Sequence, residues 1–296
     1  FIHERGRGTR PVPLLLLHGW PDSFFRYHKI IPLLADPARH GGGAGDAFDV
    51  VVPSLPGFGF SDRKALSEEA IGDLMVKLMR DLGYPGFLVS GGDKGGMVAM
   101  AMAHKYPEAV RAMHLTDVGY PTGREDFASF SPAEREFAGF IQGWWMKEGA
   151  FNMIQSSKPQ TLACSLNDSP VGWAAWVMSF VCIGASGEEM EKRLGRDELL
   201  TNIMIYWVTE TIASSIRGYY EGAHAAPAVP PGQKPRVPSS VAHCRSDAPL
   251  PREWADRNVE LKRFATLPGG HFAAWEEPEA FARDLRGFRE ALGAGA

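Results

Sequence analysis

The sequence predicts a parallel α/β sheet with helices on both faces and an all-helical segment inserted between two of its strands. Three observations predict this fold class. Short apolar runs alternate with helix-like segments through the first third of the 296-residue chain, as expected for repeated βαβ units. Helical runs without convincing strand signals then extend from about Gly119 to Gln233. Strand-like segments resume afterwards, and an amphipathic helix ends the chain.

The first third contains the expected strands and helices in alternation. Uninterrupted apolar runs are typical of strands buried on both faces of a sheet, and apolar residues three and four apart are typical of helices. By these criteria we expect strands at 13–17, 48–53, 87–90 and 110–115, and helices at 24–34, 70–82 and 97–103. The segment 1–3 resembles the middle of a strand, so we expect the natural chain to begin upstream.

The middle of the chain is predicted to be helical, and the sheet resumes after it. Aromatic-rich helical runs are expected at 137–147, 171–183 and 202–220, strands at 238–243 and 259–264, and a last helix at 278–292. That last helix carries one apolar face, which should cover the sheet, formed by Phe281, Leu285, Phe288 and Leu292. We therefore predict a core of residues 1–118 and 236–296 with a helical cap at 119–235. An independent helical domain is the alternative, but the sheet pattern returns after it.

Composition excludes several classes of protein. The formal net charge of −4 leaves no basic surface for nucleic acid. Cys164, Cys182 and Cys244 show neither disulfide-framework nor zinc-site spacing, which favours a reducing compartment. The longest uncharged run, 169–187, contains Ser, Gly and Trp and fits a buried helix better than a membrane span. We expect a cytoplasmic protein without indicated membrane contact or bound metal, and a homodimer is compatible with the sequence.

Asp93 lies in a glycine-rich turn, 91–96, between an expected strand and an expected helix. This layout is that of the nucleophile elbow of the α/β-hydrolase fold, where the usual occupant is serine. Serine attacks acyl carbons, whereas aspartate can displace a leaving group at an alkyl carbon and form an ester that must then be hydrolysed. An ordinary polar loop is the alternative interpretation, because Gly and Asp are frequent in loops.

Two further segments supply partners for Asp93. The segment 18–21 follows the first apolar strand, at the position that provides one N–H of the oxyanion hole, and the residue after the nucleophile provides the other. The donors would be the backbone N–H groups of Trp20 and Lys94, and His18 would shape the loop. His271 follows the last expected strand, which suits a general base at the carboxyl edge of an open α/β sheet.

The acid partner of His271 has two candidates. Asp247 follows the penultimate expected strand and is the first choice, because it would fix the tautomer of the histidine and stabilise its imidazolium form. Asp117 ends the strand after the elbow helix and is the second choice, since hydrolase triads can recruit their acid there. A solvated loop carboxylate is the alternative interpretation of either residue.

Six segments together resemble the epoxide hydrolases, specifically the microsomal-type branch. The segments are 18–21, 53–61, 91–93, 158–162, 167–172 and 269–278. They occur in order over essentially the whole chain, cap included. The resemblance implies that Asp93 is the nucleophile and His271 the base, and it places Asp247 in the segment of the charge-relay acid, where many members have Glu. The N-terminal extension that wraps the cap in this family is expected to be missing.

The resemblance also implies two cap tyrosines that hydrogen-bond the epoxide oxygen. Tyr219 matches one of them, but the other position holds Phe151, and a phenyl ring cannot donate a proton. Either Tyr219 works alone, or Tyr220 or Tyr206 substitutes, or epoxide opening is impaired.

The function implied is hydrolysis of an epoxide to a vicinal diol by way of an ester on Asp93. Epoxide and water would be the only partners, without cofactor or metal. Some aromatic side chains of the cap should line a mostly apolar pocket, and the candidates are Phe151, Trp144, Trp176 and Tyr220. We therefore expect a lipophilic epoxide that is bulky or aromatic.

Two other functions compete with this one. A haloalkane dehalogenase also uses an Asp nucleophile and a His base, but it often has a Trp directly after the nucleophile, where this chain has Lys94. A non-catalytic small-molecule binding protein on the same fold is favoured only by Phe151. The intact pair of Asp93 and His271 weighs against it.

Overall fold

Seven strands form a single sheet in a computed structural model that describes residues 1–183 and 185–293. Their order across the sheet is β1-β3-β2-β4-β5-β6-β7. Only the pair of β1 and β3 is antiparallel, and all other neighbouring pairs are parallel. The strands are β1 (Ile2–Glu4), β2 (Val12–Leu17), β3 (Phe48–Val52), β4 (Phe87–Gly91), β5 (Val110–Leu115), β6 (Pro238–Cys244) and β7 (Glu260–Leu267).

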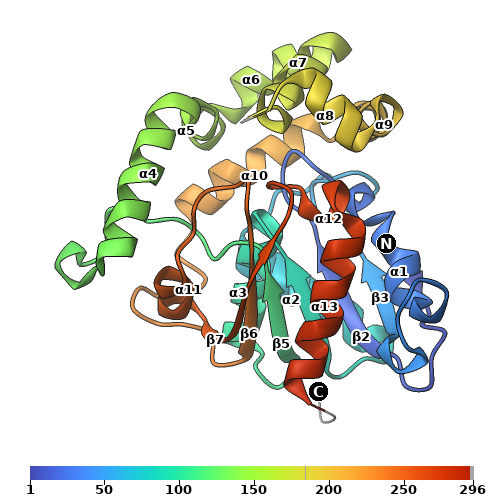
Figure 1. Cartoon of the computed structure of the whole chain (residues 1–296). Coiled ribbons are helices and arrows are strands. Elements are labelled where there is room, and N and C mark those ends of the chain that lie inside the picture. Colours follow the sequence, from blue (N-terminus) through green and yellow to red (C-terminus); the bar gives the residue numbers. More distant parts are fainter. Residues whose placement is uncertain (184, 294–296) are drawn as a thin grey trace.

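Helices cover both faces of this sheet, with α1 and α13 on the near face in Figure 1 and α2 and α3 behind it. The helices outside the cap are α1 (Ile30–Ala35), α2 (Glu68–Asp81), α3 (Lys94–Lys105), α11 (Arg252–Asn258), α12 (Ala273–Glu276) and α13 (Pro278–Leu292). Short 3-10 turns occur at Phe24–Tyr27, Pro37–Arg39, Ala44–Asp46 and Phe127–Ser129. This layered arrangement confirms the fold class predicted from the alternation of strands and helices.

The strands divide their side chains between two apolar layers because successive residues point to opposite faces of a sheet. In β2, Leu14 and Leu16 join the layer formed with α1 and α13. Leu15 and Leu17 join the layer on the side of α2 and α3, which continues into the cap. All four side chains are fully buried, which explains why this strand is an uninterrupted apolar run in the sequence.

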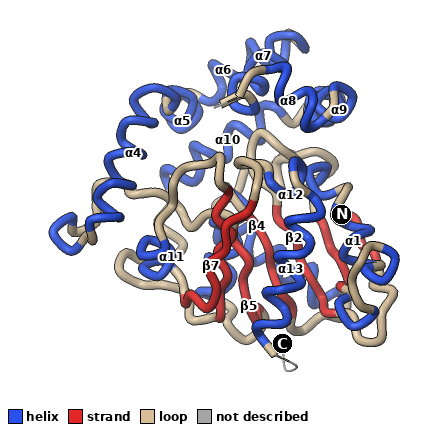
Figure 2. Tube along the Cα trace, viewed as in Figure 1, coloured by secondary structure: helices blue, strands red, loops and turns tan. Residues whose placement is uncertain are grey.

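The cap helices lie between β5 and β6 in the chain and above the sheet in Figures 1 and 2. They are α4 (Pro132–Glu148), α5 (Ala150–Ser157), α6 (Pro159–Asp168), α7 (Pro170–Val181), α8 (Gly187–Leu194), α9 (Arg196–Thr209) and α10 (Ile212–His224). Helix α10 packs against α5 and α6 and lies between them and the sheet. The buried side chains of Trp173 and Ile216 join the apolar layer on the side of α2 and α3, so the cap and the core share one hydrophobic layer.

Two predicted helices are interrupted in the structure. The segment 24–34 forms a 3-10 turn followed by α1, because Pro32 lacks an N–H and is tolerated only in the first turn of a helix. The segment 202–220 is divided between α9 and α10. Glu210 adopts a left-handed conformation there, with φ of 53°, which ends α9 and turns the chain into α10.

The uncharged run, expected to be a buried helix, contains α7, which has 12 residues and buries only the face formed by Trp173, Val177 and Val181. Within the described residues, no helix combines the length and apolarity needed to cross a bilayer. The same residues contain no group of three His, Cys, Asp or Glu side chains that could hold a metal ion. The three cysteines are free thiols, with Cys164 exposed and Cys244 buried.

Candidate active site

Asp93 occupies the sharp turn between β4 and α3. Its φ of 53° and ψ of −136° lie in a region that residues with a Cβ rarely adopt. Neighbouring glycines make the turn feasible: a Cβ on Gly91 would lie 2.6 Å from the Gly95 carbonyl carbon, and one on Gly95 would lie 2.1 Å from the Leu17 oxygen. The strained turn presents the Asp93 carboxylate at the N-terminus of α3.

One oxygen of Asp93 sits where the sequence places an oxyanion hole. The backbone N–H of Trp20 donates to Asp93 Oδ1 at 2.9 Å. Burial raises the pKa of Asp93, but His271 and the backbone N–H groups of Lys94 and Trp20 outweigh burial and hold that pKa below its ordinary value. The carboxylate is therefore ionised and available as a nucleophile at neutral pH.

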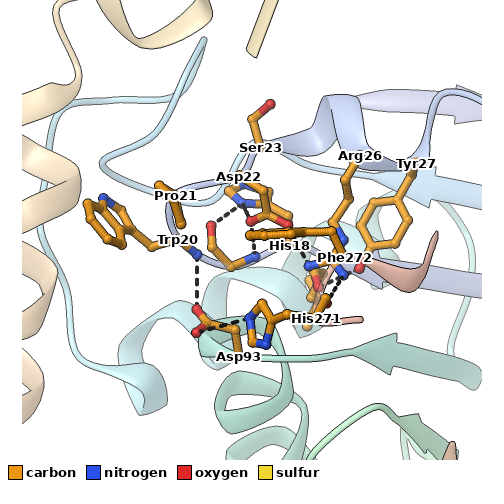
Figure 3. A network of polar contacts seen from close by, with 12 residues as sticks. His18, Trp20, Pro21, Asp22, Ser23, Arg26, Tyr27, Asp93, His271 and Phe272 are labelled. Atoms are coloured by element: carbon orange, nitrogen blue, oxygen red, sulfur yellow. Dashed lines mark hydrogen bonds and ion pairs between the residues drawn. The ribbon is translucent and has the colours of Figure 1, made fainter. Parts of the chain in front are cut away.

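His271 lies between two carboxylates (Figure 3 shows its approach to Asp93). Its Nε2 atom is 3.7 Å from Asp93 Oδ2, and its Nδ1 atom is 3.1 Å from Asp247 Oδ2. Burial lowers the pKa of His271, but the two carboxylates raise it well above its ordinary value. Asp247 thus orients the ring while Nε2 faces Asp93, which is the relative placement of a catalytic acid, histidine and nucleophile.

Asp117, the second candidate for the acid, contacts the elbow itself. Its Oδ2 atom accepts the backbone N–H of Asp93 at 2.6 Å, and its Oδ1 atom accepts that of Gly119 at 3.3 Å. Burial raises the pKa of Asp117 to about 6. The structure therefore brings Asp247 to the imidazole Nδ1, whereas Asp117 holds the backbone N–H of Asp93.

His18 is fully buried under the Trp20 loop. Its Nε2 atom accepts the backbone N–H of Leu55 at 3.0 Å, so its Nδ1 atom carries the proton and donates to the Gly19 carbonyl at 2.9 Å. Burial lowers the pKa of His18, which keeps the ring neutral. These contacts give His18 a structural place in the loop.

Aromatic rings from the cap enclose the side of the site formed by Trp20. The Phe151 ring stacks on Trp20 with centroids 6.0 Å apart, and the Tyr219 ring meets Trp20 edge-on at 5.5 Å. Phe180 packs against both Trp20, at 5.1 Å, and Phe151, at 4.7 Å. Among the described residues, no acceptor lies within hydrogen-bonding distance of the buried Trp20 indole N–H.

Comparisons with known proteins agree with this geometry. A family model described as alpha/beta hydrolase fold matches residues 12–278. Epoxide hydrolase 1 of Sus scrofa is 36% identical over 327 residues, which cover 97% of this chain and 71% of the relative. The chain belongs to the epoxide hydrolases. The resemblance inferred from the sequence motifs is therefore confirmed.

Solved epoxide hydrolases share the fold over nearly the whole chain. Juvenile hormone epoxide hydrolase from the silkworm Bombyx mori has a TM-score of 0.83 at 27% identity, covering 99% of this chain and 74% of the relative. The epoxide hydrolase of Aspergillus niger has a TM-score of 0.77 at 28% identity, covering 97% and 74%. Among its most similar relatives in sequence, the chain spans 66% to 71% of the relative's own length.

The other two tyrosines considered as epoxide oxygen donors, Tyr206 and Tyr220, contact other residues. The Tyr206 hydroxyl donates to the Asp22 carbonyl and is therefore engaged. Tyr220 stacks on His224 with ring centroids 4.0 Å apart, so it faces another side of α10 than Tyr219. These contacts leave Tyr219 as the tyrosine that packs beside Trp20.

Trp144 and Trp176 belong to the outer part of the aromatic cluster. The Trp144 ring contacts Phe151 with centroids 6.3 Å apart, and Trp176 contacts Phe180 at 5.6 Å. The Trp176 indole also donates to Gln155 Oε1 at 3.1 Å. Both tryptophans reach Trp20 only through an intervening phenylalanine.

Sequence reasoning missed three residues of the site region. Phe180 contacts Trp20 directly, yet in the sequence it is one aromatic residue among many in a cap helix. Asp22 and Arg26 form a buried ion pair under the loop 18–21 that carries Trp20. Their spacing of four residues was an available signal, because residues i and i+4 face each other in a helical turn.

Proposed function

We propose that this epoxide hydrolase converts a lipophilic epoxide to a vicinal diol through a covalent ester on Asp93. The observation that carries the proposal is the environment of the Asp93 carboxylate. Oδ1 accepts the Trp20 N–H, while Oδ2 faces His271 at 3.7 Å. One oxygen is held in place and the other is free to attack, as a carboxylate nucleophile requires.

In the first step, Asp93 Oδ2 attacks one epoxide carbon and the bond from that carbon to the epoxide oxygen breaks. Tyr219 donates its proton to the oxygen, giving a hydroxy ester. Burial and the negative charges of Asp93 and Asp22 raise the pKa of Tyr219 well above its ordinary value. Ester formation removes the charge of Asp93, so the barrier to proton donation falls as the epoxide opens.

In the second step, His271 takes a proton from water and the resulting hydroxide attacks the carboxyl carbon of the ester. The oxyanion is stabilised by the N–H groups of Trp20 and Lys94, and losing one such donor typically costs about 10²–10³ in rate. The bond from the carboxyl carbon to Oδ2 then breaks, the His271 imidazolium gives its proton to the departing oxygen, and the diol leaves with this former Asp93 oxygen. The proton released as the carboxylate reforms restores the Tyr219 hydroxyl.

The charges around His271 support this sequence of steps. Two carboxylates raise the pKa of His271 in the free enzyme, which favours the imidazolium. Esterification neutralises Asp93 and leaves only Asp247 beside the ring, so the pKa of His271 falls toward its ordinary value. The histidine thus becomes a competent base once there is an ester to hydrolyse.

The aromatic enclosure supports a bulky or aromatic epoxide. Trp20, Phe151, Phe180 and Tyr219 form one cluster of packed rings, and the cluster adjoins Asp93 through the backbone N–H of Trp20. Apolar pockets with a few directed polar groups are typical of sites for lipophilic ligands. A cytoplasmic location and a homodimer both stay predictions.

Within residues 1–183 and 185–293, the indole N–H of Trp20 has no acceptor, which favours a dehalogenase as the second candidate because such a donor could hold a leaving halide. Lys94 does not strengthen that candidate. Its ammonium pairs with Glu68 at 2.9 Å. It also lies close to Gly218 of α10, where a Cβ would be 3.6 Å from Lys94 Nζ. We therefore rank epoxide opening first.

A product assay separates these functions. The protein is incubated with styrene oxide and, separately, with 1-bromobutane, and we expect diol from the first and no bromide from the second. His271→Gln should keep the first step and lose the second, so a substrate-sized mass increase should accumulate on the peptide that contains Asp93. His224→Gln, on the exposed surface of α10, is the control and should turn over normally. Bromide without diol, or an unmodified Asp93 peptide, would contradict the proposal.

A further inference from the structure

A buried ion pair lies beside the site and takes no part in the steps above. Asp22 and Arg26 are only 1% and 2% exposed, and Arg26 Nη1 donates to Asp22 Oδ2. Figure 3 shows Arg26 between the loop that carries Trp20 and the loop that carries His271. The pair therefore stands between two loops that come from opposite ends of the chain.

Asp22 fixes the loop of the oxyanion hole. Its Oδ1 atom accepts the backbone N–H of Gly19 at 2.8 Å, one residue before the Trp20 N–H that points at Asp93. Gly19 is also in close approach to the nucleophile, since a Cβ at this position would lie 2.4 Å from Asp93 Oδ1. A shift of this loop would therefore move the oxyanion donor directly.

Arg26 fixes the loop of the histidine. Its Nη2 atom donates to the backbone carbonyl of His271 at 3.1 Å. Its guanidinium also lies over the ring of Phe272, the next residue, at 5.8 Å from the centroid. Asp22 and Arg26 thus join the oxyanion donor to the general base through one hydrogen-bonded bridge (Figure 3).

Stability alone gives little reason to keep charges at this position. Removing two charges from water costs several kcal/mol per ion, and well-packed apolar residues are often as stabilising as a buried pair. The planar guanidinium of an arginine, by contrast, can donate to a carboxylate and to a carbonyl from two different nitrogens and so hold the two groups at a fixed separation. This contrast indicates that the geometry of the two loops is what the pair secures.

We propose that Asp22 and Arg26 are positioning residues that hold the Trp20 N–H and the His271 imidazole at the separation needed for hydrolysis of the ester. The inference rests on the function proposed above. Ester formation needs the Asp93 carboxylate and an oxygen donor, but not the base. Ester hydrolysis needs the base and the oxyanion donor together, so it is the step that depends on the bridge.

The test is a single-turnover experiment with Arg26→Met and styrene oxide. The reaction is quenched in acid at successive times, and mass spectrometry follows the ester on Asp93 while chromatography follows the diol. We expect ester hydrolysis to slow by up to about 100-fold, since a displacement near 1 Å can cost that much, while ester formation changes far less. The ester should therefore accumulate in the variant and not in the wild type.

Arg263→Met is the matched control. Arg263 also pairs with a buried aspartate, donating to Asp284 Oδ1 at 2.6 Å, but that pair lies on the α13 side of the sheet. We expect it to reduce stability without changing the ratio of ester to free enzyme. Arg26→Lys keeps the positive charge but loses the planar guanidinium, so its rate of ester hydrolysis should lie between those of the wild type and Arg26→Met. Arg26→Lys replaces Arg26→Met if the latter does not fold.

The outcomes separate the two proposals. If the wild type forms no ester and no diol, the proposed function fails. If the wild type turns over but both Arg26 variants slow the two steps equally, or neither step, the positioning role is overturned. Accumulation of ester in the Arg26 variants and not in Arg263→Met supports it.

Discussion

At the level of single residues, Phe151 bears on the first step of the proposed mechanism. The family resemblance implies a hydroxyl donor at this position, but the phenyl ring here stacks on Trp20. A phenolic oxygen on that ring would enter the same aromatic enclosure as Tyr219, whose ring centroid lies 6.0 Å from that of Phe151. Two donors would share the developing charge of the epoxide oxygen that one donor now carries.

Phe151→Tyr should therefore accelerate ester formation. A hydrogen bond to a charged group contributes about 1.5–3 kcal/mol, and each 1.36 kcal/mol is tenfold in rate, so we expect roughly a tenfold gain or more. The rate of ester formation on styrene oxide, followed by quenched mass spectrometry, measures it. Phe180→Tyr adds a hydroxyl elsewhere in the same cluster and should give no comparable gain. Equal rates for wild type and Phe151→Tyr would show that one donor suffices.

Residues that follow a local rule could be predicted from the sequence, and those defined by long-range contacts could not. The placement of Asp93 and His271 near each other was predictable because each follows a strand at the same edge of the sheet, whereas their catalytic roles stay predictions. Asp247 and Asp117 stayed alternatives because both follow strands, and only the contact with His271 Nδ1 distinguishes them. Phe180 contacts Trp20 although the two residues are 160 positions apart in the chain. Neither composition nor local spacing predicts such a contact.

At the level of elements, helix α9 holds the loop that carries Trp20 from the cap side. Asn202 Nδ2 donates to the Pro21 carbonyl at 2.9 Å, and its Oδ1 atom accepts the Ser23 hydroxyl at 2.9 Å. Tyr206, one turn later, donates to the Asp22 carbonyl. The cap therefore contacts the same loop that Asp22 and Arg26 connect to the core. A movement of α9 would displace the backbone of Trp20.

Asn202→Leu should impair both stability and turnover. It leaves the buried Pro21 carbonyl and Ser23 hydroxyl without these partners, which costs about 1–3 kcal/mol, and it loosens the loop that carries the Trp20 N–H. Urea midpoints and kcat for styrene oxide measure the two effects. Asn258→Leu removes a comparable hydrogen bond, which the Asn258 side-chain amide donates to the Trp254 carbonyl in α11. This control should reduce stability without lowering kcat. A normal kcat in Asn202→Leu would mean that the loop holds its position without the cap.

Secondary structure was predicted best where packing and periodicity agree. The strand at 110–115 and the helix at 278–292 have the expected bounds. The join between α9 and α10 was missed because Glu210 ends the helix by a backbone conformation and not by a breaker residue. Short cap helices such as α8 escape a periodicity argument, since two turns hold too few apolar positions to define a face.

At the scale of the whole molecule, a row of polar side chains crosses the sheet on the α13 side. Ser90, His114, Ser240 and Arg263 occupy successive positions of the register from β4 to β7. Asp284 of α13 joins the row, accepting from His114 at 3.0 Å and from Arg263 at 2.6 Å. Because these groups are largely buried, the row fixes the angle at which α13 crosses the strands.

Asp284 should make folding sensitive to acid. Burial raises its pKa, but His114 and Arg263 outweigh burial and lower it to about 2, below the ordinary value near 3.9. A lowered carboxyl pKa stabilises the fold above the unfolded value, and this stabilisation, about 2 kcal/mol, is lost as pH falls from about 4 to 2. Asp284→Asn should flatten the free energy of unfolding across that range, measured by urea titration. Asp256→Asn, at an exposed position, should retain the wild-type slope, and a retained slope in Asp284→Asn would assign the acid sensitivity elsewhere.

The unequal surroundings of the two Asp93 oxygens have a consequence for the atoms of the product. In the proposed mechanism, Oδ1 stays hydrogen-bonded to the Trp20 N–H while Oδ2 leaves with the diol, so the oxygen taken from water becomes the new Oδ2. That same atom then attacks the next substrate molecule. If the carboxylate does not rotate between cycles, each diol carries the solvent oxygen captured one turnover earlier. An isotope label in the water would therefore enter the diol one turnover late.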